Sequence, residues 1–508
     1  MKKNKIALCL AMLFAGSLAT GCYGGGNKPD PNKNVLYVGV YDGALGYEWL
    51  EEYEKIYEAL NPDVDVWIDD KKADYDSVLT TKMPNNRQDI YFLSHNSYYD
   101  FCRAGILEDL TYTINEKVYD KDMNLVGENG SKSILDSMYD EFKTIYEKDG
   151  KYYAIPHFMS PAGVFYDAQL FDKYDYEVPN TYNELMDLMD TMVLDEITPF
   201  SFSGMLYIVV NALSGVWASY EGAADYNLNN TFEGTDSTLG EITSANGYIL
   251  QGQEGKKAAL KFAYDLMSKS AYTTAKTAAA SLSNETAQQE YVKSINTTAT
   301  KENRIAMFLE SSYWEPEVKD YMNSLKVLNK DWAWGKREFK FMPFPKFENV
   351  AGIANQTNDK TTVFCSNTRS MVCINKASDQ KDLAKDFLKF CQSREALAIY
   401  VKYTSSLRPY EFSMTDEEYK ACTTLGQSIY DLTQDENVEF VGNHDISPLK
   451  QVQNTEWYHT WSFQTTGKAI GNIPTKLFYT NKKLTVEDYF EGMSKYWSKS
   501  YWNNNMLG

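Results

Sequence analysis

Apolar runs and amphipathic stretches alternate along the chain after its N-terminal segment. The runs 35–40, 64–68 and 89–93 are rich in aliphatic and aromatic residues, a composition that favours β-strands. A helical pattern spans 47–60, and a shorter one follows the third run over 98–103. Alternating strands and helices predict an α/β lobe with a largely parallel sheet. Ligands of such sheets bind beyond the carboxyl ends of the strands, so we expect a binding edge there.

Two β-prone runs followed by a capped helix form the most informative stretch. The run 152–155 is stopped by Pro156, because proline donates no hydrogen bond to a neighbouring strand. A second run covers 163–166. Thr181 then stands at a predicted helix N-cap, with Glu184 three residues later as in a capping box. One strand ends, the chain crosses, another strand starts, and a helix follows.

Later segments continue this mixed pattern. Over 380–392, apolar residues recur at the spacing of one buried helix face. The polar segment 225–247 is predicted as a long excursion or hairpin, and 271–300 as surface helix or loop. A capping-box pattern at 484–490 predicts the start of the last helix. Further helices are predicted at 207–219 and 255–269.

Length favours a large protein with two domains, and the aromatic content is compatible with binding of flat polar ligands. The chain has 508 residues, more than one hydrophobic core usually holds, so two domains are expected. Aromatic residues make up 14%, which suits ligand binding but also ordinary cores. The formal net charge of −20 argues against nucleic acid as a partner and against a basic membrane-binding patch.

The N-terminus has the pattern of an export signal. Three lysines precede the apolar run 6–19, which is too short to span a bilayer with margin. The run leads to Leu18-Ala-Thr-Gly-Cys22, which resembles a bacterial lipobox, although Ala19 stands where leucine is commoner. We therefore predict a signal peptide over 1–21, a lipidated Cys22 and a flexible tether over 22–33. An ordinary secretory peptide cleaved nearby is the alternative.

Cysteine and histidine usage predicts neither a disulfide framework nor a metal site. Five cysteines follow the tether, an odd number without regular spacing. Cys365 and Cys373 flank a predicted turn and either pair or remain two buried thiols. Four histidines and no Cys-x-x-Cys motif argue against zinc. In the segment 120–124, acidic or amide residues stand at alternate positions as in a calcium-binding loop, but the glycine and the final glutamate of such a loop are missing. No metal or cofactor is therefore predicted.

Several segments resemble one known family. The Pro156 crossing is similar to the first interlobe crossing of the extracellular solute-binding proteins of ABC importers, the sugar-binding family that includes maltose-binding protein. The stretch 304–316 resembles the buried strand of that family that ends in a ligand-facing aromatic residue. The resemblance is also close over 374–390. The order and spacing of the segments match those of the family over 35–497.

This resemblance implies a type II periplasmic-binding-protein-like fold. Such a fold is α/β, with two lobes joined by about three hinge crossings. Lobe one is expected to contain 34–156 and 371–404, and lobe two 157–370 and 405–508. Arg369 and Arg408 lie at expected crossings. They are either ligand contacts or residues that form salt bridges at the hinge.

A sugar site needs aromatic rings that pack on the sugar faces, beside polar groups that bond its hydroxyls. For each candidate residue, the alternative to ligand binding is a purely structural role, such as packing in a core. In the maltose-binding branch an acidic residue matches Ser160, so the resemblance does not extend to maltodextrin specificity. The candidates are Trp314, Tyr313, Trp457 and Trp461 as aromatic platforms, Asp42, Tyr47, Ser94, Asn96 and Ser97 in lobe one, and His157, Ser160, Ser201, Phe202 and Ser203 after the crossing.

Trp314 is the first choice for the platform. It follows the apolar run 305–309, and polar neighbours surround it, so we expect it to be exposed at the end of a strand. Tyr313 is the alternative, because adjacent strand residues face opposite ways.

The predicted function is binding without catalysis. The sequence contains no nucleophile elbow, P-loop, dinucleotide fingerprint or His-Glu-x-x-His motif. The resemblance implies a monomeric lipoprotein on the extracytoplasmic face, held to the membrane by its lipid anchor alone. It captures an oligosaccharide between its lobes and delivers it to the transmembrane subunits of an ABC permease. The alternatives are a non-sugar solute on the same scaffold and a surface-anchored glycan hydrolase, because some of the 70 acidic residues must lie near each other.

Overall fold

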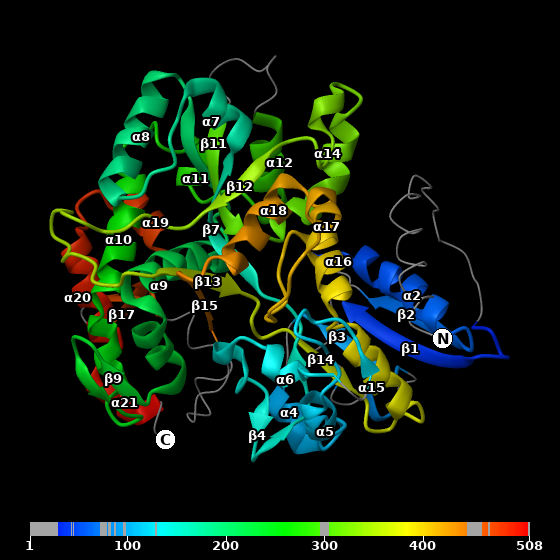
Figure 1. Cartoon of the computed structure of the whole chain (residues 1–508). Helices are drawn as coiled ribbons and strands as arrows, with labels where there is room; N and C mark the ends of the chain where they lie inside the picture. Colours follow the sequence, from blue (N-terminus) through cyan, green and yellow to red (C-terminus); the bar gives the residue numbers. More distant parts are fainter. Residues whose placement is uncertain are drawn as a thin grey trace.

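The computed structural model describes residues 29–41, 43, 45–71, 79, 83–85, 88–94, 98–127, 130–294, 304–443, 460–465 and 468–505. These residues form an α/β structure, as predicted, with two principal sheets that lie in different parts of the molecule (Figure 1). No helix in these ranges is long and apolar enough to cross a bilayer.

The first sheet has the strand order β2-β1-β3-β14-β6. Strand β1 pairs in parallel with β2 and β3, which confirms the predicted parallel sheet, while β14 runs antiparallel to β3 and β6. Leu36, Val38 and Val40 of β1 are buried at the alternate positions expected for a strand. The strands are β1 (Asn34–Tyr41), β2 (Val64–Lys71), β3 (Ile90–Leu93), β6 (Ile155–Pro156) and β14 (Met371–Ile374).

The second sheet has the order β15-β13-β7-β11-β8, and β12 also pairs with β7. All eight residues of β7 are buried, because elements cover both faces of this strand. The long helix α9 (Leu206–Thr231) packs on β13, β11 and β7. The strands are β7 (Ser160–Asp167), β8 (Thr198–Phe202), β11 (Ile305–Ser311), β12 (Phe339–Met342), β13 (Thr361–Ser366) and β15 (Val438–Gly442).

Helices cover both sheets. Around the first sheet and its connections lie α2 (Glu48–Leu60), α4 (Tyr98–Ala104), α5 (Thr111–Asn115), α6 (Ile134–Ser137), α15 (Lys381–Phe390) and α16 (Arg394–Thr404). The other helices are α7 (Ala168–Tyr174), α8 (Tyr182–Leu194), α10 (Glu254–Leu266), α11 (Ala275–Ala278), α12 (Asn284–Ser294), α13 (Trp314–Glu317), α14 (Lys319–Leu325), α17 (Asp416–Ala421), α18 (Thr424–Asp431), α19 (Pro474–Thr480), α20 (Val486–Tyr496) and α21 (Lys499–Asn505). Short hairpins pair β4 (Glu147–Lys148) with β5 (Lys151–Tyr152), β9 (Gly234–Asp236) with β10 (Gly240–Ile242), and β16 (Phe463–Thr465) with β17 (Lys468–Gly471).

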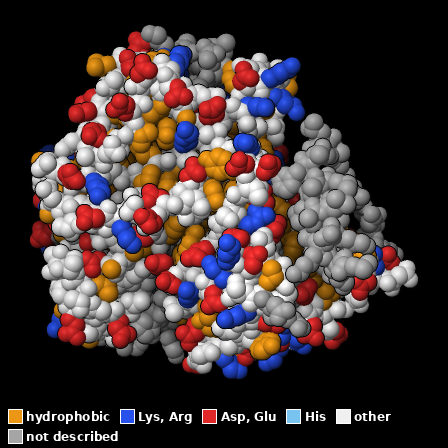
Figure 2. All heavy atoms as spheres, viewed as in Figure 1, with side chains coloured by type: hydrophobic (Ala, Val, Ile, Leu, Met, Phe, Trp, Pro, Cys, Tyr) orange, Lys and Arg blue, Asp and Glu red, His pale blue; other side chains and the backbone are white. Residues whose placement is uncertain are grey.

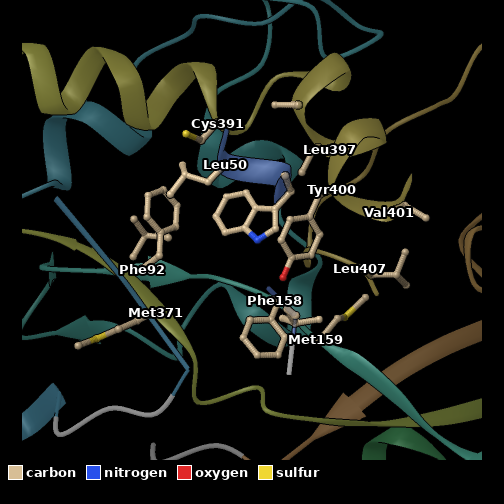
Figure 3. Packing of buried hydrophobic residues seen from close by; sticks show 14 of the residues in the cluster. Leu50, Phe92, Phe158, Met159, Met371, Cys391, Leu397, Tyr400, Val401 and Leu407 are labelled. Carbon is tan, nitrogen blue, oxygen red and sulfur yellow. The ribbon is translucent and has the colours of Figure 1, made fainter. Parts of the chain in front are cut away.

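Two large apolar clusters form the cores. The first lies on the first sheet and extends to Phe165 and Phe308 of the second. Near its centre Phe92, Phe158 and Tyr400 surround a buried indole (Figure 3), and the ring of Trp49 lies 5.2 Å from those of Phe92 and Tyr400. The second cluster packs α8, α9, α10 and α20 against the second sheet. A small third cluster joins Trp497 and Trp502 to the end of α9.

Several local predictions are confirmed, and others need correction. Thr181 caps α8, with the reciprocal capping-box hydrogen bonds to Glu184. The segment 271–300, expected at the surface, contributes Tyr291 of α12 to the first core, where its ring stacks on Phe308. The helix that begins after Thr485 is not the last one, because α21 follows it.

The chain passes between the two sheets at three places. Strand β6 belongs to the first sheet and β7 to the second, while β13 belongs to the second and β14 to the first. The third passage leads from α16 through 405–409 toward β15. We retain 34–156 with 371–404 and 157–370 with 405–508 as proposed lobes, a division that this strand membership supports. Cys365 and Cys373 lie on β13 and β14 and are buried thiols that are not joined in a disulfide.

Candidate functional site

A cleft with a cavity volume of about 320 Å³ lies where the two sheets meet. Its walls come from both sheets and from the passages between them. Figure 2 shows acidic and basic side chains interspersed on the face in view, with hydrophobic side chains gathered near its centre. The cleft is lined by Val40, Tyr41, Gly43, Leu45, Gly46, Trp49, Phe92, Ser94, His157, Phe158, Tyr207, Asn211, Tyr313, Glu317, Phe364, Cys365, Ser366, Asn367, Thr368, Arg369 and Asn443.

One wall is built at the carboxyl ends of β1 and β3, where parallel sheets commonly bind ligands. Tyr41 ends β1, and Ser94 directly follows β3. The turn between β1 and α2 passes through Gly46 at φ 61, a left-handed conformation that favours glycine. The Trp49 indole Nε1–H donates to the Gly46 carbonyl oxygen at 3.1 Å and so fixes this turn against α2.

The floor of the cleft contains a buried histidine–arginine pair. The Arg408 guanidinium Nη2 lies 3.0 Å from His157 Nδ1, and Nη1 donates to the Cys391 carbonyl oxygen at 2.7 Å. The guanidinium carbon lies 5.2–5.7 Å from the ring centroids of Trp49, Phe92 and Tyr400. Burial, and then the Arg408 charge, hold the pKa of His157 well below its ordinary value of 6.5, so the imidazole is neutral.

The opposite wall belongs to the second sheet and its connections. Helix α9 contributes Tyr207 and Asn211, and Tyr313 comes from the turn between β11 and α13. The segment after β13 adds Thr368, whose hydroxyl donates to the Asn443 carbonyl oxygen at 2.8 Å. Glu317 is the one carboxylate among the described lining residues.

A seam of buried serine hydroxyls joins the passages beside the cleft. Ser406 Oγ lies 3.1 Å from Ser160 Oγ and 2.7 Å from Ser312 Oγ. Ser366 Oγ donates to Ser311 Oγ at 2.8 Å. These hydroxyls satisfy one another at the strand ends of the second sheet, where a buried polar group without a partner would be costly.

The structure places three predicted site residues on the cleft, namely Ser94, His157 and Tyr313. Arg369, predicted at a crossing, also lines it, and Arg408 lies buried behind His157. Tyr47 is half-buried against the first core and does not line the cleft. Asp42, Asn96, Ser97 and Trp457 lie outside the described residues.

Trp314 is buried instead of exposed at a strand end, so the expectation for its position is wrong. Its side chain is fully buried, with ring centroids of Phe339 at 4.9 Å and Tyr291 at 5.5 Å. Strand β11 ends at Ser311, and Trp314 begins helix α13, so strand alternation does not extend to it. Pro316, which suggested an exposed end, stands in the first turn of that helix, where proline is tolerated.

The other predicted residues that do not line the cleft have structural contacts. Trp461 is fully buried in the second core beside Trp217, because α20 covers it, and Phe202 belongs to the same core. Ser160 is part of the serine seam. Ser201 Oγ bonds the Thr277 hydroxyl at 3.1 Å, and Ser203 Oγ donates to the Leu282 carbonyl oxygen at 3.1 Å.

Several lining residues escaped the sequence analysis. Tyr207 and Asn211 are one helical turn apart on α9 and face the cleft together. Asn211 interrupts a long apolar helix, and this isolated amide was a usable signal. Thr368 and Asn443 carried no such signal in the sequence, because the end of β13 and the end of β15 come together only in the folded sheet.

The cleft combines aromatic rings, amides, hydroxyls and an imidazole with one guanidinium and one carboxyl group in a concave site, which suits a polar solute. The family profile described as bacterial extracellular solute-binding protein matches residues 42–398. No curated protein sequence matches the chain.

Solved structures show a similar fold. The maltotriose-binding protein of Thermus thermophilus, bound with maltotriose, is 16% identical over 92% of this chain and 99% of that chain, with a TM-score of 0.54. RafE in complex with raffinose is 13% identical over 91% and 100%, with a TM-score of 0.53. Maltose-bound MalE3 of T. maritima is 16% identical over 91% and 99%, with a TM-score of 0.55. These likenesses confirm the two-lobe α/β fold, and with the profile match they show that the chain belongs to the bacterial extracellular solute-binding protein family.

Proposed function

We propose that this protein is the substrate-binding lipoprotein of an ABC importer and captures an oligosaccharide in the cleft between its two sheets. The observation that carries the proposal is the cleft itself, to which both sheets contribute aromatic and polar side chains. Tyr41, Tyr207 and Tyr313 supply rings suited to sugar faces, and Asn211 supplies an amide suited to hydroxyls. Similar folds have been solved with maltotriose, raffinose and maltose.

The proposed mechanism is closure of the two lobes about the three passages. A solute that contacts both walls favours the closed form over the open one, and the permease then recognises the closed form. The chain makes no covalent change in the solute. The predicted lipid on Cys22 keeps the protein beside its transmembrane subunits.

A thermal-shift series with the mature chain tests this function. The solutes are maltotriose, raffinose and maltose. A dipeptide and a polyol test the alternative that the protein binds a solute other than an oligosaccharide. A solute that binds only the folded form at one hundred times its Kd stabilises it by about 2.7 kcal/mol. We expect at least one oligosaccharide to raise Tm by a few degrees and to be recovered unchanged. A rise with the dipeptide or polyol alone contradicts a sugar ligand, and recovery of cleaved sugar identifies a hydrolase.

A further inference from the structure

Arg408 is a buried cation without a carboxylate partner among the described residues. Its side chain is 1% exposed and donates hydrogen bonds to the Cys391 carbonyl oxygen and to His157. Its Nε–H has no hydrogen-bond partner within the described part of the chain. Arg337, equally buried, contrasts with it, because its Nη2 bonds the Asp167 carboxylate at 2.6 Å. A buried charge without a counter-ion is costly, so the contact that Arg408 makes with His157 calls for a function.

The contact fixes the protonation of the imidazole. An arginine side chain donates hydrogen bonds and accepts none. His157 Nδ1 must therefore offer its lone pair to Arg408 Nη2, at 3.0 Å. A neutral imidazole carries one proton, so that proton is on Nε2. Protonation of Nδ1 would set two N–H groups and two positive charges against each other.

The ring is also fixed in orientation. Rings of Trp49, Phe92, Phe158 and Tyr400 surround His157 with centroid distances of 5.1–5.8 Å. Nδ1 is occupied by Arg408, and the ring also contacts the backbone of His157 itself, which lies within reach of Nδ1 but not of Nε2. Neither contact uses the Nε2–H, and His157 lines the cleft, where that N–H can meet a bound molecule.

The groups around the imidazole give it one charged neighbour. Arg408 is the cation that acts on His157. The titratable neighbours on the packed elements are Tyr53 of α2, Tyr400 of α16 and Cys391. All three are neutral at ordinary pH, because burial raises their pKa values, that of Cys391 to about 12.

We propose that Arg408 is a positioning residue that fixes His157 as a permanent Nε2–H donor on the cleft floor, where it binds an oxygen acceptor of the solute. The acceptor is a hydroxyl, ring or glycosidic oxygen, and a solute ammonium group is disfavoured there. The solute contact rests on the proposed function, whereas the state of the imidazole does not. Arg408 acts through His157 and need not touch the solute.

Ring-nitrogen NMR on the mature chain with labelled histidine tests the state of the imidazole. The sequence has four histidines, so the His157→Gln spectrum assigns the His157 signals by their loss. We expect wild-type His157 to carry its proton on Nε2 from pH 5 to pH 8, without titrating. In Arg408→Met both tautomers should appear and the titration midpoint should rise, while Arg408→Lys, which keeps the cation, should change less. A wild-type proton on Nδ1, or titration near 6.5, overturns the proposal, and the wild-type series decides it even if Arg408→Met does not fold.

Calorimetry with maltotriose and raffinose tests the solute contact. His157→Phe keeps a ring in the cage but lacks the donor, and we expect about tenfold weaker binding than wild type. His157→Gln, whose amide can donate from a similar place, should recover most of that loss. Melting curves of the free variants check that the fold is retained. Wild-type affinity in a folded His157→Phe overturns the contact. Failure of every sugar to bind wild type contradicts the proposed function instead, and the NMR series still decides the state of the donor.

Discussion

Two adjacent residues, Tyr313 and Trp314, face different parts of the molecule. Tyr313 lines the cleft, whereas Trp314 is fully buried among the rings of Phe339 and Tyr291. The turn after Ser311 separates them, because it rotates the chain from a strand into helix α13. An aromatic residue next to a strand end can therefore serve either the core or the site, and the backbone turn decides which.

Truncation of these two residues should have different effects. Trp314→Ala removes a large buried ring, so we expect it to lower the free energy of unfolding by about 3–5 kcal/mol. Tyr313→Ala should instead weaken sugar binding about 30-fold, the effect of losing an aromatic anchor worth about 2 kcal/mol. Urea unfolding and calorimetry measure the two losses. A stable Trp314→Ala that no longer binds sugar would contradict this division.

Glu315 carries a buried carboxyl beside the third passage. Ser405 Oγ donates to its Oε2 at 2.6 Å and Thr423 Oγ1 at 2.8 Å. Burial raises the pKa of Glu315 from 4.5 to about 7, and the two hydroxyl donors oppose that rise only in part. The folded protein therefore holds this proton over a pH range in which the unfolded chain has released it.

Stability should consequently fall as pH rises from about 4.5 to about 7, and then level off. Glu315→Gln removes the titrating group, so this part of the decline should vanish. We expect the variant to gain on the order of 3 kcal/mol relative to wild type between pH 5 and pH 8. Urea unfolding at both pH values measures the gain, with the exposed Glu177→Gln as control. Parallel pH profiles of wild type and Glu315→Gln would contradict the assignment.

Among the elements, the strands of the first sheet follow from sequence because each is a bounded apolar run. Strands β1 and β3 begin within a residue of the predicted positions. The core contact of helix α12 could not be predicted from the sequence, because only isolated residues such as Tyr291 reach the core and most of the helix surface is polar. The cleft is predicted in part. Ser94 and His157 stand next to strand ends, whereas Asn211 and Asn443 reach the cleft only through tertiary packing.

Helix α8 offers a test of local sequence signals. The hydroxyl of Thr181 accepts from the Glu184 backbone N–H, and the Glu184 carboxylate accepts from the Thr181 N–H at 3.1 Å. Thr181→Ala should cost about 1 kcal/mol, because it leaves a helix N–H without this partner. Thr191→Ala is the matched control, since Thr191 is exposed in the last turn of the same helix and alanine favours helix. Chemical denaturation should show a loss for Thr181→Ala and none for Thr191→Ala. Equal losses would mean that the box contributes nothing.

At the scale of the whole molecule, the three passages keep the two sheets connected while the cleft between them stays open. The serine seam lies at these passages, with Ser406 bonded to both Ser160 and Ser312. Ser160 begins β7 and Ser312 follows β11, so both belong to the second sheet, and Ser406 lies in the third passage within the same proposed lobe. The seam therefore fastens the third passage to the second sheet.

The predicted lipid anchor also concerns the whole protein, and its prediction rests on residues outside the described structure. The lipobox resemblance at Leu18–Cys22 predicts that Cys22→Ala abolishes lipid attachment. In a detergent phase-separation assay, Cys22→Ala should be found in the aqueous phase. Wild type and the control variant Cys102→Ala should both be found in the detergent phase. An acylated, membrane-bound Cys22→Ala would contradict the lipobox assignment.

Closure of the lobes should be visible in solution scattering. A compact chain of this length has a radius of gyration of about 23 Å, and an open cleft raises the value above that of the closed form. Because a solute that touches both walls stabilises the closed form, saturating sugar should lower the radius of gyration of wild type. His157→Phe, which loses one contact on the floor, should need about ten times more of the same sugar for the same decrease. A bound sugar that leaves the scattering profile unchanged would rule out a large hinge motion, and the permease would then have to recognise the occupied cleft itself.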